Sequence, residues 1–269
     1  VLIEGEPVEI TCYRSDGEYI GHRKPAQVTF ESSLEEDLKR RDFTVNAMAY
    51  SPNDGLIDLY GGQSDLSKGI IRCVGEPEKR FDEDALRILR GLRFSSCLGF
   101  AIEEKTAKAI LAQRELLKSI SAERITAELK RLLCGKDVRR ILLDYREVIG
   151  VFIPELRESF DFKQNNPHHF LDVYGHICLS VENVRPQWLM RLTMLLHDIG
   201  KPRMHTVDEN GISHFKKHQF EGAYMAEEIL KRLRIDNASA KYIYELIWEH
   251  DNRIAATKKS VRRFMALHD

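Results

Sequence analysis

The sequence has 269 residues, enough for about two domains and a sizeable core. Its hydrophobic content of 43% and charged content of 31% are ordinary for a folded, partly helical protein, and no apolar run reaches the roughly 18 residues that a membrane span needs. The net charge of −1 excludes a general attraction to polyanions, so a nucleic-acid surface would have to be a local patch. Five scattered cysteines without C-x-x-C spacing exclude a disulfide scaffold or a zinc knuckle and indicate a reducing, cytoplasmic location.

The first 60 residues have the pattern of strands and turns. Alternating apolar residues predict an opening strand over residues 8–13, and a second strand follows a turn and covers residues 26–30. A short helix is expected through residues 40–49, followed by a strand over residues 56–59. This part of the chain is therefore expected to be α+β.

Helical spacing dominates from Asp82 onward. Apolar residues recur at a 3.6-residue period as far as Val148, and a polar stretch at 161–167 predicts a linker before helices resume at His169. The expected fold class is α+β, mostly α. The chain opens without an initiator Met and ends without a helix cap, so we interpret it as a piece of a longer protein. The predicted domains are residues 1–66, 67–156 and 157–269, the last of them truncated at its C-terminal side.

Two short motifs carry nucleotide chemistry. In the first, Arg41 and Asp42 can donate to a phosphate and accept from a sugar hydroxyl, and Asn46 adds both a donor and an acceptor. In the second, Asp84 and Arg87 are expected on one helix face, where a carboxylate and a guanidinium can imitate the hydrogen-bonding edge of a base. Such a pair can accept cytosine and adenine, which both offer an exocyclic amine beside a ring nitrogen. Acidic residues followed three positions later by an arginine are also common at helix N-termini, where they interact with the helix dipole and form ion pairs without binding a ligand. The second motif also contains Glu83 and Arg90.

These motifs resemble, in order and spacing, those of class II tRNA nucleotidyltransferases (CCA-adding enzymes) and bacterial poly(A) polymerases. The segment at 58–66 is similar to the hinge motif of that family, and Ser121 resembles the N-cap of its neck helix. The resemblance implies a partial nucleotidyltransferase head of the polymerase β type, a helical neck and an HD-type bundle. It also implies addition of CMP and AMP from CTP and ATP to tRNA 3′ ends, with Mg²⁺ as the metal.

The catalytic aspartates of that family are a D-x-D pair that follows a GGxxRD turn, and this arrangement is not found in the sequence. The resemblance places both upstream of Val1, with Glu9 as a third carboxylate that faces them. Between Arg114 and Arg146 nine basic residues stand against five acidic ones. This segment is expected either to meet the tRNA acceptor stem or to form ordinary solvated helix faces. The predicted RNA-binding residues are Arg124, Lys130, Arg131, Arg139 and Arg140.

A second group of residues points to metal chemistry. His197 and Asp198 are adjacent, follow an apolar run, and precede a glycine and Lys201. With His176 before them and Asp251 after them, they resemble the ligands of the HD phosphohydrolase superfamily, H…HD…D. Such ligands bind a divalent transition metal that lowers the pKa of a coordinated water. His218 is a candidate outer ligand or ligand of a second metal ion, whereas His169 and His250 are expected to be bystanders.

The leading hypothesis is a CCA-adding tRNA nucleotidyltransferase. Its alternatives are a poly(A) polymerase or an enzyme restricted to CC or A addition, a metal-dependent HD phosphohydrolase acting on RNA-end or nucleotide phosphates, and a non-catalytic RNA-binding fragment. The expected partners are tRNA, ATP and CTP, with no membrane partner. The sequence leaves the oligomeric state open.

Overall fold

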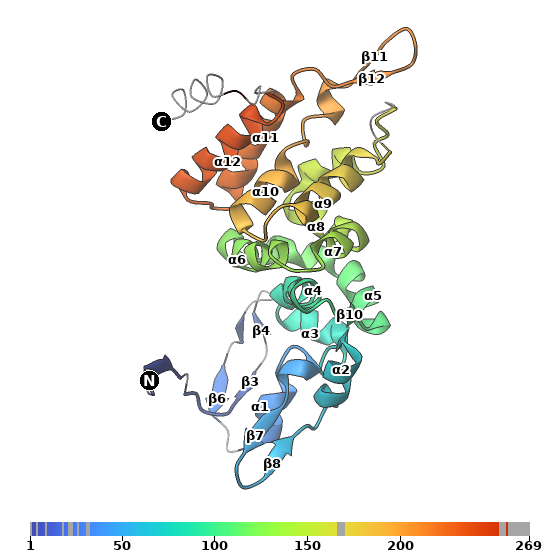
Figure 1. Cartoon of the computed structure of the whole chain (residues 1–269). Helices are drawn as coiled ribbons and strands as arrows, with labels where there is room; N and C mark the ends of the chain where they lie inside the picture. The colour runs from blue at the N-terminus through green and yellow to red at the C-terminus, as the bar shows by residue number, and fades with distance from the viewer. Residues whose placement is uncertain are drawn as a thin grey trace.

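The computed structural model describes residues 2–3, 5–8, 10–17, 19–20, 24–25, 27–30, 33–165, 170–252 and 257. The helices are α1 (Leu34–Lys39), α2 (Gly62–Lys68), α3 (Pro77–Glu83), α4 (Leu86–Leu98), α5 (Glu104–Ala112), α6 (Ala122–Leu133), α7 (Val138–Asp144), α8 (Arg146–Phe152), α9 (Val173–Asn183), α10 (Trp188–Leu196), α11 (His218–Arg232) and α12 (Asn237–Glu249). Figure 1 shows the strand-rich N-terminal part at one end, helices α3 to α8 in the middle and α9 to α12 at the other end. The expected α+β, mostly helical class is confirmed.

The described strands form two-stranded pairs: β1 (Leu2–Ile3) with β2 (Glu6–Pro7), β3 (Arg14–Asp16) with β6 (Val28–Phe30), β4 (Tyr19–Ile20) with β5 (Lys24–Pro25), β7 (Ala49–Ser51) with β8 (Gly55–Ile57), and β11 (Thr206–Val207) with β12 (Ser213–His214), all antiparallel, and β9 (Ile70–Ile71) with β10 (Ala101–Ile102), parallel. The expected strand over residues 8–13 is wrong for the described members of that segment. Ile10 is 74% exposed, so the apolar alternation that predicted this strand does not place Ile10 against a core of described residues.

The expected helix through residues 40–49 is also wrong. Helix α1 ends at Lys39, and a single 3-10 turn, Thr44–Asn46, follows. The reason is competition for backbone hydrogen bonds. Thr44 N donates to Arg72 O and Val74 N donates to Asp42 O, so this backbone pairs with the segment after β9 instead of closing helical bonds.

A break between α3 and α4 corrects the expectation that Glu83, Asp84 and Arg87 share one continuous helix face. Asp84 has extended dihedral angles and ends α3, while its carboxylate accepts a hydrogen bond from Leu86 N, two residues on. An aspartate side chain that satisfies nearby backbone N–H groups favours such a junction over a helix interior. Glu83 consequently belongs to α3 and Arg87 to α4, with Asp84 at the junction between the two helices.

Gly61 and Gly62 form a tight start to α2. Gly61 has φ 75°, which favours glycine, and a Cβ on Gly62 would lie 2.2 Å from Thr44 O. Asp58 accepts from the N–H groups of Gly62 and Gln63. The segment that resembles a hinge motif therefore builds a fixed turn against the Thr44 backbone.

Helix α6 joins the middle helices to the C-terminal bundle, and buried side chains form one hydrophobic core from Phe43 to Ile247. Thr126 on α6 donates to Leu233 O at 2.6 Å. Buried Arg191 on α10 donates to Leu133 O, in the last residue of α6, and to Gly135 O just beyond that helix. These bonds satisfy carbonyls that helix ends leave open and hold the bundle against the middle helices.

Candidate functional site

The first predicted motif forms a compact polar cluster around Asp42. This carboxylate is buried and accepts hydrogen bonds from Phe43 N at 2.9 Å and from the Asn46 side-chain amide at 3.2 Å. Arg90, on α4, donates to its other oxygen at 2.7 Å. The structure thus brings together Asp42, Asn46 and Arg90, which the sequence separates by up to 48 positions.

Asp37 organises the arginines beside this cluster, and the sequence analysis missed it. Its buried carboxylate pairs with Arg40 at 2.5 Å and with Arg41 at 3.1 Å. Burial raises the pKa of Asp37, but the hydrogen bonds and charges of the two arginines outweigh that effect and hold the pKa below its usual value. The Arg41 side chain remains 44% exposed. An acid one helical turn before an arginine pair was the available signal.

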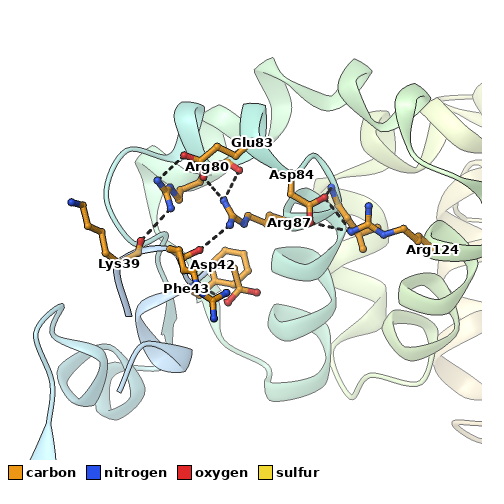
Figure 2. A network of polar contacts seen from close by, with 10 residues as sticks. Lys39, Asp42, Phe43, Arg80, Glu83, Asp84, Arg87 and Arg124 are labelled. Atoms are coloured by element: carbon orange, nitrogen blue, oxygen red, sulfur yellow. Dashed lines mark hydrogen bonds and ion pairs between the residues drawn. The ribbon is translucent and has the colours of Figure 1, made fainter. Parts of the chain in front are cut away.

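Arg87 lies at the centre of the second motif, as Figure 2 shows. Its guanidinium donates to Glu83 Oε2 at 2.7 Å, to Arg80 O at 3.0 Å and to Arg40 O at 2.9 Å. The last bond reaches the backbone immediately before Arg41. The two nucleotide motifs are therefore joined directly, by Arg87 to a carbonyl and by Arg90 to Asp42.

Asp84 pairs with Arg124 on α6 at 3.0 Å, and not with Arg87 (Figure 2). This differs from the expectation of a side-by-side Asp84 and Arg87 pair, because the break between α3 and α4 turns Asp84 toward α6. Asp84 keeps partial exposure at 19% of its side chain. Its part in choosing a base stays a prediction, and Arg124 joins this site in addition to its predicted contact with RNA.

The remaining predicted RNA-binding residues have varied surroundings. Lys130 lies over the Trp188 ring at 3.7 Å, and Arg139 pairs with Glu182 at 3.5 Å. Arg140 donates to Asp137 at 2.6 Å, while Arg131 is exposed on α6. Their contact with RNA stays a prediction. Glu9, the predicted catalytic carboxylate, lies outside the described residues, as does His169.

The predicted metal ligands His176, His197 and Asp198 come together in the C-terminal bundle. Asp198 is 2% exposed, and its Oδ2 lies 3.2 Å from the Nε2 atoms of both histidines. Lys201 Nζ lies 2.8 Å from the same oxygen. These groups line a cavity of about 480 Å³. The HD residues therefore form one site with an opening.

Two further histidines complete the cluster, and one of them was expected to be a bystander. His218 Nε2 lies 3.1 Å from Asp198 Oδ1, and His250 Nε2 lies 3.6 Å from it. Asp251, the predicted ligand, is exposed at the cavity wall and belongs to neither group of atoms close enough to share a cation. The structure presents His250 at the position where the H…HD…D pattern predicts Asp251. Helix α12 ends at Glu249, so His250 is the first residue after it and Asp251 the second. A difference of one position along the chain therefore decides which of the two side chains faces the cluster.

Hydrogen bonds at the far ring nitrogens indicate what this cluster can hold. The Nδ1 atoms of His197, His218 and His250 lie 2.6 to 2.8 Å from backbone carbonyls, a contact that requires a proton on Nδ1. In a neutral imidazole Nε2 is then an unprotonated acceptor. Yet His218 Nε2 lies 3.1 Å from His250 Nε2, and both face a carboxylate. Acceptors at this separation need a proton or a cation between them, so the donor set fits a divalent metal ion.

The electrostatics of Asp198 agree with this chemistry. Burial raises its pKa, but the charge of His197 and the hydrogen bonds of the surrounding histidines outweigh burial and hold the pKa well below its usual value. Burial lowers the pKa of His250, whereas its hydrogen bond to Asp198 raises the pKa above the ordinary histidine value. The buried carboxylate thus draws positive charge to this point.

Three family models match successive parts of the chain. A model described as the poly A polymerase head domain matches residues 1–72, one for a probable RNA- and SrmB-binding site of polymerase A matches 99–159, and an HD domain model matches 168–267. The CCA-adding enzyme of Geobacillus thermodenitrificans is 48% identical over 160 residues, which cover 59% of this chain and 40% of that enzyme. That of Bacillus subtilis is 48% identical over 142 residues, 53% of this chain and 36% of the enzyme.

Among solved structures, the Bacillus stearothermophilus CCA-adding enzyme in complex with CTP matches with a TM-score of 0.58 and 30% identity over 99% of this chain and 66% of that one. The chain belongs to the family of CCA-adding enzymes and bacterial poly(A) polymerases. The expected head of this family and its HD domain are thereby confirmed. The matched stretch spans less than half of the two curated relatives.

An apo CCA-adding enzyme matches with a TM-score of 0.57 at 23% identity over 89% of this chain and 52% of that chain, a likeness of fold. Nucleotidyltransferase heads and HD domains are both metal-dependent families. Within the part of the chain that the structure describes, no helix is long and apolar enough to cross a membrane.

Proposed function

We propose that the protein containing this chain adds CMP and AMP, from CTP and ATP, to the 3′ ends of tRNA. The observation that carries the proposal is the direct joining of two motifs: Arg90 lies 2.6 Å from Asp42, and Arg87 donates to the carbonyl of Arg40. One motif has the donors and acceptors for sugar and phosphate, and the other has those for a base edge. Family membership supports the same chemistry.

Each residue has a stated task in this proposal. Asp42, fixed by Asn46 and Arg90, accepts from a sugar hydroxyl, while the half-exposed Arg41 donates to phosphate. Asp84 and Arg87 choose the base. Mg²⁺ would be held by carboxylates of the head, for which Glu9 is this chain's candidate, and it would assist in-line attack by the tRNA hydroxyl. The predicted basic residues of α6 and α7 would contact the acceptor stem.

The test replaces Asp84 and Arg87 with alanine in the complete polypeptide that carries this chain. The parent protein should label tRNA lacking CCA with CTP and ATP and reject GTP and UTP, and the double variant should lose that discrimination. Unchanged rejection of GTP and UTP by the variant would contradict the assignment of the base site. Sequencing the added 3′ ends separates CCA addition from CC addition, A addition and polyadenylation.

A second candidate function is a metal-dependent phosphohydrolase that acts on RNA-end or nucleotide phosphates. It is favoured by the arrangement of four imidazole Nε2 atoms around the buried carboxylate of Asp198. A divalent transition metal held by His176, His197 and Asp198, with His218 and His250 opposite, would lower the pKa of a bound water. Lys201 and the cavity around it would hold the phosphate. His197→Ala should abolish hydrolysis of a 2′,3′-cyclic phosphate and leave nucleotide addition intact.

His205→Gln is the matched control, because His205 lies outside both groups of ligand atoms. Hydrolysis that survives His197→Ala would exclude the metal site as its source. A cytoplasmic location is part of the proposal, and it is supported by buried free thiols such as Cys73 and Cys178.

A further inference from the structure

Two arginines share one carboxylate beneath the predicted base site. Arg80 on α3 donates to Glu83 Oε1 at 2.7 Å, and Arg87 on α4 donates to Glu83 Oε2 at the same distance (Figure 2). All three side chains are at least 84% buried. Charge-assisted hydrogen bonds at this burial hold side chains in one geometry. Glu83 therefore couples the orientation of Arg87 to that of Arg80.

The same two arginines form hydrogen bonds to the carboxyl end of α1. Arg80 donates to Lys39 O at 3.1 Å and Arg87 to Arg40 O at 2.9 Å, so both satisfy carbonyls at the carboxyl end of that helix. These carbonyls immediately precede Arg41. Arg80 thus connects the base-site helix to the backbone that leads into the sugar motif.

Arg80 also contacts both predicted base-selecting residues through its backbone. Its carbonyl accepts from Asp84 N at 3.3 Å and from the Arg87 guanidinium at 3.0 Å. The side chain and the backbone of one residue therefore meet Glu83, Asp84 and Arg87. No sequence motif singled out this position.

We propose that Arg80 is a positioning residue for base selection, acting through Glu83 on Arg87. The inference rests on the proposed nucleotide-binding function of Asp84 and Arg87. If the Arg80 side chain is removed, Glu83 Oε1 loses the hydrogen bond from Arg80, and the carboxylate can turn both oxygens toward Arg87. The guanidinium would then shift from the place where it faces a base, although the sugar and phosphate contacts of Asp42 and Arg41 would remain.

The experiment measures equilibrium binding of CTP, ATP, GTP and UTP to the complete polypeptide that carries this chain and to its Arg80→Met variant. Because equilibrium binding is measured, the readout requires no nucleotide transfer. We expect the ratio of the GTP to the CTP dissociation constant to fall about tenfold in the variant, since a displaced guanidinium no longer rejects the wrong base edge. Arg80→Lys should recover part of the ratio, because an ammonium reaches Glu83 without the fork that spans two acceptors.

Arg93→Met is the matched control. Arg93 lies on α4, forms an equally buried pair with Glu128 at 2.5 Å, and lies over the Phe94 ring at 3.8 Å, so its described ion pair joins α4 to α6 and not to Asp42 or Glu83. It should lower the melting temperature to a similar extent and leave the ratio unchanged. If Arg80→Met does not fold, Glu83→Gln decides, because it keeps the side-chain shape while removing the charge that holds both arginines.

The outcomes separate the two claims. A parent chain that binds all four nucleotides equally would overturn the proposed base site and the role of Arg80 together. A parent chain that discriminates, an Arg87→Ala variant that does not, and an Arg80→Met variant within twofold of the parent ratio would overturn the positioning role alone. An equal loss of the ratio in Arg93→Met would likewise assign the effect to general destabilisation.

Discussion

Arg90→Met should weaken the binding of every nucleotide without changing the preference among them. Arg90 donates to Asp42 at 2.7 Å from α4, and this is the contact by which the middle helices orient the proposed sugar-binding carboxylate. Hydrogen bonds to charged groups contribute about 1.5–3 kcal/mol, and the 34% exposure of the arginine side chain favours the lower end. A loss of about 1.4 kcal/mol of binding free energy corresponds to an increase of about tenfold in the dissociation constant.

The assay is titration of the chain with CTP, ATP and the deoxynucleotide dCTP. The variant should bind CTP and ATP more weakly by the same factor and should lose most of the difference between CTP and dCTP, because Asp42 no longer faces the sugar hydroxyl. Arg93→Met, three residues further along the same helix, should bind as the parent does. Parent-like CTP binding in Arg90→Met, or a loss confined to one base, would refute the reasoning.

Three further predictions concern stability and reactivity. Asp37→Asn should lower the free energy of unfolding by about 1–2 kcal/mol at pH 7. Because the pKa of Asp37 is depressed in the folded chain, this loss should be present above the unfolded pKa of about 3.9 and should vanish as the pH falls through the folded pKa. Urea unfolding curves recorded across this pH range will measure it. Gly62→Ala should lower the free energy of unfolding by about 1–3 kcal/mol in thermal melts, because the new Cβ would collide with Thr44 O. Gly5→Ala is not an equivalent control, because the φ of 85° at Gly5 would strain an alanine by itself. Cys73, whose pKa burial raises to about 12, should resist iodoacetamide at pH 8 while exposed Cys12 reacts, as mass spectrometry of the labelled peptides will show.

The sequence determined the class of the fold because long helical periodicity survives in any context. Helices such as α6 and α11 follow from apolar residues at a 3.6-residue spacing alone. It also determined which residue types are present for nucleotide and metal chemistry, because motifs such as His197-Asp198 carry their donors and acceptors with them. These features are local, and local features can be read along the chain.

Only the tertiary structure decided which of those groups meet. Asp84 turns to Arg124 because the helix breaks at Asp84, and no spacing rule shows where a carboxylate will satisfy nearby backbone N–H groups instead. The Glu83–Arg87 pair keeps the i,i+4 spacing that is visible in the sequence. His250 joins the histidines around Asp198 through the packing of α12, which decides the direction of the side chain that follows its last turn. Contacts between residues 40 or more positions apart depend on how helices pack, and packing is set by the whole core and not by any one segment.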